Sequence, residues 1–132
     1  MEIVIAVCVI GILLLVSVPV ISNITSTMKL KSVAEGIVSD LRLAQDKAIT
    51  AGGEIKVEFR KKSIFGDRAE YSVGPFRTIK LEGRYDFRYD ETIRFSKTGF
   101  PPAGGSGTVI LEDLAGRSKR IIVSSAGRIR VE

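Results

Sequence analysis

The feature that most constrains this chain is an uninterrupted apolar run near its N-terminal end. The run extends from Ile3 to Ile21 and contains no charged side chain. As a helix it would be about 28 Å long, close to the roughly 30 Å hydrocarbon core of a bilayer. The remainder of a 132-residue chain is too small to enclose a helix that is apolar on every face. The run predicts a membrane-spanning helix. A secretory signal peptide is the weaker alternative, because no basic segment precedes the run.

Three residues in or beside the run carry further expectations. Glu2 places an acid at the membrane edge, and Pro19 lacks a backbone N–H, which predicts a kink or a locally melted turn. Neither residue is needed in a plain anchor. Cys8, the only cysteine, is interpreted as a small residue facing lipid or a protein core, and it excludes an intrachain disulfide.

Beyond Pro19 the pattern becomes periodic. Apolar residues recur at three- and four-residue steps while charged residues occupy the other faces, which predicts an amphipathic helix. Gly52-Gly53 supplies a left-handed cap. Because no strong loop signal separates the two parts, we expect one helix from about Met1 to Ala51, on the order of 75 Å long. The stripe consists of Leu30, Val33, Ala34, Ile37, Leu41, Ala44 and Ala48.

From Glu54 onward the hydrophobic period is two, as expected for half-buried strands. Turn signals separate the runs and no helical pattern intervenes, so the fold class is α+β, with a long N-terminal helix packed on a small antiparallel sheet or sandwich. We expect three parts: residues 1–27 as a transmembrane or filament-core helix, 28–53 as an amphipathic helix, and 54–132 as a β-rich head. The predicted strands cover residues 54–60, 71–74, 76–81, 85–89, 92–95, 108–111, 118–123 and 128–131.

Composition argues against an enzyme. The chain has no histidine, the commonest general base and nitrogen ligand, and one cysteine cannot form a cysteine-rich metal site. The remote alternative is a membrane-anchored hydrolase that uses the acid cluster Asp86, Asp90 and Glu91. Basic residues surround this cluster, and no neighbouring motif supports catalysis. We therefore expect no catalytic residue, metal, cofactor or small-molecule substrate.

Specific motifs resemble a known family. Glu2-Ile3-Val4-Ile5-Ala6-Val7, followed by Gly11 and Pro19, is similar to the N-terminal helix of type IV pilins and pseudopilins, in which glutamate, glycine and proline have this spacing. The segment from Gly36 to Ile49 resembles the corresponding helix of the GspH/FimT pseudopilin family. The ending from Ile121 to Val131 is similar to that family's last strands.

This resemblance implies a structural subunit that waits in the bacterial inner membrane and then packs its helix among other pilin subunits in a filament. It assigns filament assembly to Glu2, Gly11 and Pro19, with Glu2 paired to the N-terminal amine of the adjacent subunit. It implies a single-pass protein with a cytoplasmic N-terminus and a periplasmic or extracellular head. Family precursors carry a basic leader, and the new amine is methylated after cleavage. Either Met1 is a misassigned start, or the leader and the first mature residues precede it.

Three functions stay open within this class: a minor pseudopilin of type II secretion, a minor pilin of a type IV pilus, and a FimT-like pilin that binds double-stranded DNA for uptake. Gly127-Arg128-Ile129-Arg130 resembles the Gly-Arg-x-Arg tail of DNA-binding FimT proteins, and alternation places Arg128 and Arg130 on one face. Glu132 opposes this interpretation, and an ordinary solvated face explains the arginines equally well. Further basic residues proposed for the same patch are Arg117, Lys119 and Arg120.

Overall fold

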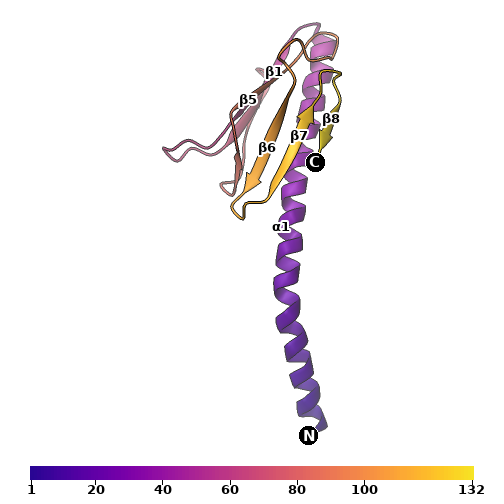
Figure 1. The fold of residues 1–132 in the computed structure, drawn as a ribbon, viewed down its shortest axis with the longest axis vertical. Coiled ribbons are helices and arrows are strands. Elements are labelled where there is room, and N and C mark those ends of the chain that lie inside the picture. The colour runs from indigo at the N-terminus through magenta and orange to yellow at the C-terminus, as the bar shows by residue number, and fades with distance from the viewer.

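The computed structural model describes residues 1–132, except that the side chains of residues 18–20 lie outside the description. Its one described helix, α1 (Glu2–Ala51), is followed by eight strands (Figure 1). The kink or melted turn predicted at Pro19 falls on the undescribed part and stays a prediction. The strands are β1 (Ile55–Arg60), β2 (Glu70–Val73), β3 (Arg77–Lys80), β4 (Tyr85–Phe87), β5 (Glu91–Phe95), β6 (Gly107–Asp113), β7 (Ser118–Val123) and β8 (Ile129–Val131).

The second half of α1 is the part that packs on the strands. Every residue of the predicted apolar stripe is buried there except Val33, which is half-buried against the core. The helix ends where the sequence predicted, because Gly52 adopts a left-handed conformation (φ 66°, ψ 27°) and its N–H bonds to the carbonyl oxygen of Ala48. Figure 1 shows the first half of α1 extending away from the head without any strand beside it.

The strands form two antiparallel four-stranded sheets. The first has the order β3-β2-β1-β5 and the second the order β4-β6-β7-β8. Both sheets contact α1, and β5 lies next to β6, where the two sheets meet. The α+β architecture expected from the sequence is confirmed, with a pair of sheets sharing one helix.

One core fills the space between the helix and both sheets. Phe59 of β1 stacks on Tyr71 of β2, with ring centroids 5.5 Å apart, and meets Phe87 of β4 edge-on at 5.3 Å. Side chains from the first sheet therefore pack directly against one from the second. Leu41, Phe95 and Ile121 bring the helix and both sheets into the same buried cluster.

The predicted strands agree with the observed ones to within a few residues. The largest differences are at β4, which ends at Phe87 rather than at residue 89, and at β6, which extends to Asp113. Phe76 was predicted to begin a strand, but it lies in the turn before β3, exposed and with the Lys47 ammonium 6.0 Å from its ring centroid. The turn begins two residues earlier at Gly74, which adopts a positive φ of 49°.

Candidate filament-assembly helix and head surface

The first half of α1 exposes an apolar surface around its whole circumference. Its large hydrophobic side chains from Ile3 to Val16 are between 50% and 80% exposed, and none of the most apolar window is buried. Within the described chain this is the one helix long and apolar enough to cross a membrane. Contiguous apolar surface of this extent marks contact with lipid or with another protein.

Glu2 lies in the first turn of this helix and is exposed. An acid there is stabilised by the partial positive charge of the helix N-terminus. No ion-pair partner for Glu2 is present among the described residues of the chain. Gly11 is also unexplained by internal packing, because a Cβ added to it would meet nothing within 4 Å. Any demand for glycine at this position must come from another molecule.

Arg117 ties the head to α1 near the middle of the helix. Its guanidinium pairs with Asp113 at 2.8 Å and donates to the carbonyl oxygen of Asn23 at 3.4 Å and to Oγ1 of Thr27 at 3.3 Å. Burial opposes ionisation of Asp113, but hydrogen bonds from the backbone and side chain of Arg117 and from the N–H of Ala115 outweigh it. The pKa of Asp113 therefore lies below its ordinary value of 3.8.

Two further contacts orient the helix against the sheets. The Tyr71 hydroxyl donates to Asp40 at 2.6 Å, and the other Asp40 oxygen lies 3.4 Å from the Arg77 guanidinium. Burial and the bond to Asp40 raise the pKa of Tyr71 well above its ordinary value. Five residues further along α1, the Gln45 amide donates to the carbonyl oxygen of Gly99 at 2.7 Å. These polar contacts fix the rotation of the helix about its axis.

The structure divides the five basic residues of the predicted DNA patch. Arg120, Arg128 and Arg130 are exposed, and Arg120 and Arg130 lie on the same face because both pair with Glu132, at 3.1 and 3.5 Å. Lys119 precedes Arg120 in β7 and so points to the opposite face. The Arg117 guanidinium is occupied by its contacts with Asp113 and α1. Arg128 is the one arginine of the five that is exposed and has no ion-pair partner among the described residues.

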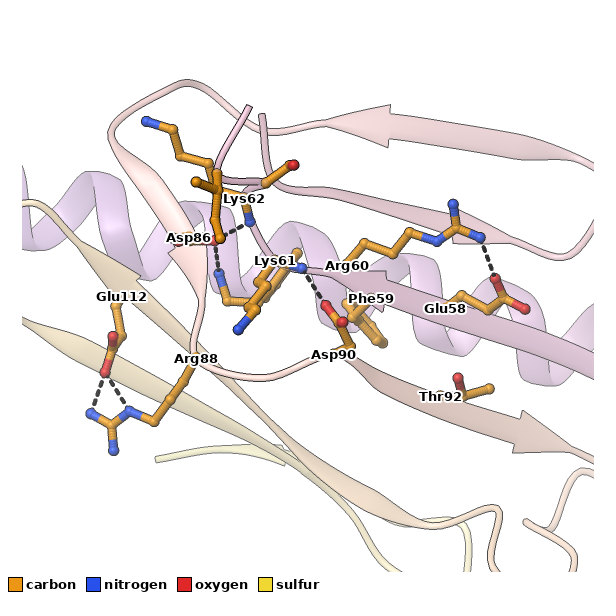
Figure 2. Close-up of a pocket in the computed structure, with 13 residues that line it drawn as sticks. Glu58, Phe59, Arg60, Lys61, Lys62, Asp86, Arg88, Asp90, Thr92 and Glu112 are labelled. Atoms are coloured by element: carbon orange, nitrogen blue, oxygen red, sulfur yellow. Dashed lines mark hydrogen bonds and ion pairs between the residues drawn. The ribbon is translucent and has the colours of Figure 1, made fainter. Parts of the chain in front are cut away.

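Two of the three acids of the hydrolase alternative, Asp86 and Asp90, line an open groove of about 760 Å³ between β1, β4 and β5, whereas Glu91 is not among the lining residues and its carboxylate lies beside Gly107. Figure 2 shows that the first two acids hold the chain together: Asp90 accepts the backbone N–H of Lys61 at 2.8 Å, and Asp86 accepts that of Lys62 at 2.7 Å. Arg88 on the same groove is paired with Glu112. The described residues contain no group of His, Cys, Asp and Glu that is arranged to hold a metal. The groove is a structural junction between the strands.

Sequence reasoning missed two elements of this surface. Asp40 is one of the charged residues that the helical pattern assigns to the faces away from the stripe. It lies three residues from Ile37 and four from Ala44, and this spacing is the signal that places it at the border of the buried stripe. Leu114 was also overlooked. A leucine in a turn otherwise made of Asp113, Ala115 and Gly116 signals an exposed apolar tip, and it is 84% exposed.

Comparison with known proteins agrees with the geometry. The sequence profile of the family described as type II transport protein GspH matches residues 33–127. No curated protein matches the chain in sequence. Two crystal structures of the type IV minor pilin FimU of Pseudomonas aeruginosa have the same fold, with TM-scores of 0.59 and 0.61 at 20% and 19% identity. The alignments cover 78% and 82% of this chain and 92% and 91% of FimU.

The profile includes most of the amphipathic half of α1, from residue 33 onward, and all the strands up to β7, more than half of the chain. The likeness to FimU concerns the fold alone, and that fold is the long helix carrying an antiparallel head seen in Figure 1. The chain therefore belongs to the GspH family of pilin-like structural subunits.

Proposed function

We propose that this chain is a minor subunit of a type IV pilus or of a type II secretion pseudopilus. The observation that carries the proposal is the division of α1: one half is apolar and exposed on all sides, and the other half is packed into the head. A chain built in this way can exchange its lipid contacts for contacts with neighbouring helices while the head keeps its structure. The family to which the chain belongs supports this role.

Before assembly, residues 3–21 hold the chain in the inner membrane, with the N-terminus in the cytoplasm and the head in the periplasm. In this arrangement residues 1–27 form the membrane and filament-core part, 28–53 the supporting helix, and 54–132 the head. The orientation rests on the resemblance to pilins, whose basic leader stays in the cytoplasm. The exposed apolar side chains and the first downstream cation, Lys29, are compatible with it.

Glu2 provides the electrostatic step of assembly. A carboxylate that leaves the membrane edge for an apolar helix bundle loses its hydration, so it must gain a cationic partner. The amine of the adjacent mature subunit supplies that partner. Gly11 lets neighbouring helices approach closely, as small residues do in membrane helix pairs. Pro19 weakens the helix locally, so that the assembled rod can bend.

The test is the substitution Glu2→Ala in the full chain. Membrane insertion should be retained, because removing a charge makes insertion easier. Incorporation into filaments should fall sharply, because the neighbour's amine loses its partner at a cost of about 3–5 kcal/mol. The measurement is the amount of the subunit in sheared filaments and in the membrane fraction. Glu35→Ala is the matched control, since Glu35 is an exposed acid on the head half of the helix.

Equal incorporation of Glu2→Ala and wild-type subunits at matched expression would contradict the assembly role of Glu2. Absence of both the wild-type and the Glu2→Ala subunits from the membrane fraction would instead contradict the anchoring role of residues 3–21. The identity of the neighbouring genes would distinguish the two filament systems, because a secretion pseudopilus and a type IV pilus are built from different sets of proteins.

Uptake of double-stranded DNA is a second candidate. The favouring observation is the exposure of Arg128 and Arg130 near the end of the chain, on the side that also carries Arg120. Phosphate contacts from such residues give weak, salt-sensitive binding, with dissociation constants of roughly 10⁻⁴–10⁻⁶ M near physiological salt. Glu132 limits the patch, because its carboxylate lies within ion-pair distance of two of the three arginines and offsets one of their positive charges.

The DNA proposal is tested by fluorescence anisotropy across a salt series on a soluble head that begins at Met28 and so keeps the amphipathic half of α1. Arg128→Gln with Arg130→Gln should lower both the affinity and the salt slope, by about one slope unit for each lost phosphate contact. Glu132→Gln should raise the affinity, because it frees Arg120 and Arg130. The charge-matched control is Arg42→Gln with Lys97→Gln, both exposed elsewhere on the head. Absence of salt-sensitive binding by the wild-type head would rule out this function.

A further inference from the structure

The lowest part of the head is the turn between β6 and β7, which lies beside the middle of α1 (Figure 1). The turn is closed by Asp113, which accepts backbone N–H groups of Ala115 and Arg117 at 2.9 and 3.0 Å. The N–H of Leu114 also bonds to the carbonyl oxygen of Arg84, in the turn before β4, at 3.2 Å. The tip is thus held in place while its apolar side chain projects outward.

The contacts of Arg117 give the height of this turn along the helix. Its guanidinium reaches the carbonyl of Asn23 and the hydroxyl of Thr27. These residues lie two and six positions beyond Ile21, or about 3 and 9 Å along the helix axis. The headgroup layer on each side of a bilayer is roughly 5–8 Å thick. If the hydrocarbon core ends at Ile21, the turn lies at the level of the lipid headgroups.

The rest of the surface at this height suits a membrane interface. The charge-free stretch of α1 continues to Met28, and Ile24 and Met28 keep their side chains exposed. Lys29 is the first charge after this stretch and is exposed; helix geometry tilts its side chain toward the N-terminus, that is, toward the bilayer. Arg84, in the turn before β4, lies beside the β6–β7 turn because its carbonyl oxygen accepts the N–H of Leu114, although Glu82 is 3.4 Å from its guanidinium and offsets its charge.

We propose that, before assembly, the base of the head rests on the phospholipid surface, with Leu114 inserted among the headgroups and Lys29 and Arg84 beside the phosphates. This inference rests on the proposed membrane location of residues 3–21. Arg117 acts as a positioning residue, because it sets the height of the turn relative to the membrane span. The head is then held in one orientation above the bilayer and leaves the lipid when the subunit enters a filament.

The test places one environment-sensitive fluorophore on the full chain in vesicles of phosphatidylethanolamine and phosphatidylglycerol containing a nitroxide-labelled lipid. Cys8→Ala removes the native thiol, and Leu114→Cys supplies the labelling site. Leu14→Cys marks the membrane span, and Ile64→Cys marks a fully exposed loop between β1 and β2. The probes at positions 14 and 114 should lose fluorescence through quenching, whereas the probe at 64 should stay bright.

Each outcome has a separate meaning. Quenching at position 14 without quenching at 114 overturns the docking of the head and leaves the membrane anchor intact. Absence of quenching at position 14 overturns the membrane part of the proposed function. Equal quenching at 64 and 114 means that the head lies on its side, which also overturns the proposal. Arg117→Gln should decrease the quenching at 114, whereas the control Arg68→Gln, in the β1–β2 loop, should leave it unchanged.

Discussion

Residues 3–16 and residues 30–48 belong to one continuous helix, but they differ in what surrounds them. The first segment is apolar on all faces and exposed on all faces. The second gathers most of its apolar side chains in one stripe, whose members are less than a tenth exposed except for Val33, while Leu43 lies off the stripe and is 41% exposed. The continuous helix therefore does not fold as one unit with the head. The distribution of apolar residues around the axis decides which part is anchored to the head.

The second half also carries polar contacts that the first half lacks. Asp40 accepts from Tyr71 and faces Arg77, and Gln45 donates to the loop at Gly99. These bonds have fixed directions, so they select one rotation of the helix against the sheets. Apolar contact has no such direction. The first half is therefore free to exchange one set of apolar neighbours for another.

The largest expected difference between the halves is their effect on solubility. The full chain should sediment with membranes and require detergent, because burial of its exposed apolar residues releases on the order of 1.5–3 kcal/mol each. A chain beginning at Met28 should be a soluble, β-rich monomer, because the core is built from Leu30 onward. Ultracentrifugation, size-exclusion chromatography and circular dichroism measure both properties. Recovery of the full chain as a soluble monomer without detergent would contradict the comparison.

The next effect concerns the stability of the head. Leu41→Ala should lower the free energy of unfolding by about 2–5 kcal/mol, since Leu41 is completely buried between the helix and the sheets. Leu14→Ala makes the same chemical change at a side chain that is 62% exposed and should leave head stability unchanged. Thermal unfolding of both full-length variants in the same detergent provides the measurement. Similar destabilisation by both would show that the first half also supports the head.

A smaller effect is expected at the polar contacts that orient the helix against the sheets. Tyr71→Phe should destabilise the head by about 1.5–3 kcal/mol, the usual range for a hydrogen bond to a charged group. The pKa of Tyr71 is raised on folding, so its contribution is complete below the ordinary value of 10.0 and is lost as the pH rises above it. Denaturant unfolding should show that the difference in the free energy of unfolding between wild type and variant is smaller at pH 11 than at pH 7. An equal difference at both pH values would contradict a stabilising hydrogen bond from Tyr71 to Asp40.

The smallest effect is expected at Gly11. Gly11→Ala should slightly stabilise the isolated helix, by about 0.5–1 kcal/mol, because alanine loses less backbone entropy and nothing lies within 4 Å of the added Cβ. Filament incorporation should nevertheless decrease if neighbouring helices approach each other at this position. Circular dichroism in detergent and the subunit content of sheared filaments measure the two effects. Unchanged incorporation would remove Gly11 from the assembly surface.

Much of the fold was predictable because its signals are local. The step from a three- and four-residue period to a two-residue period marked the end of α1 and the start of β1, and Gly52 supplied the cap. Long-range contacts left weaker traces. Nothing local to Arg117 reveals that it reaches back to Asn23, 94 residues earlier, so its membership of a basic patch was a reasonable but incomplete prediction.

The sequence by itself determined the long helix, its apolar and amphipathic halves, the β-rich head and the resemblance to pilins, because each depends on periodicity or on motifs within a few turns of chain. Tertiary structure decided that the strands form two sheets around one core, that Glu132 pairs with Arg120 of the neighbouring strand, and that Asp86 and Asp90 hold backbone groups. Side chains far apart in sequence share these sites, and only the packing of the sheets on the helix brings them within bonding distance.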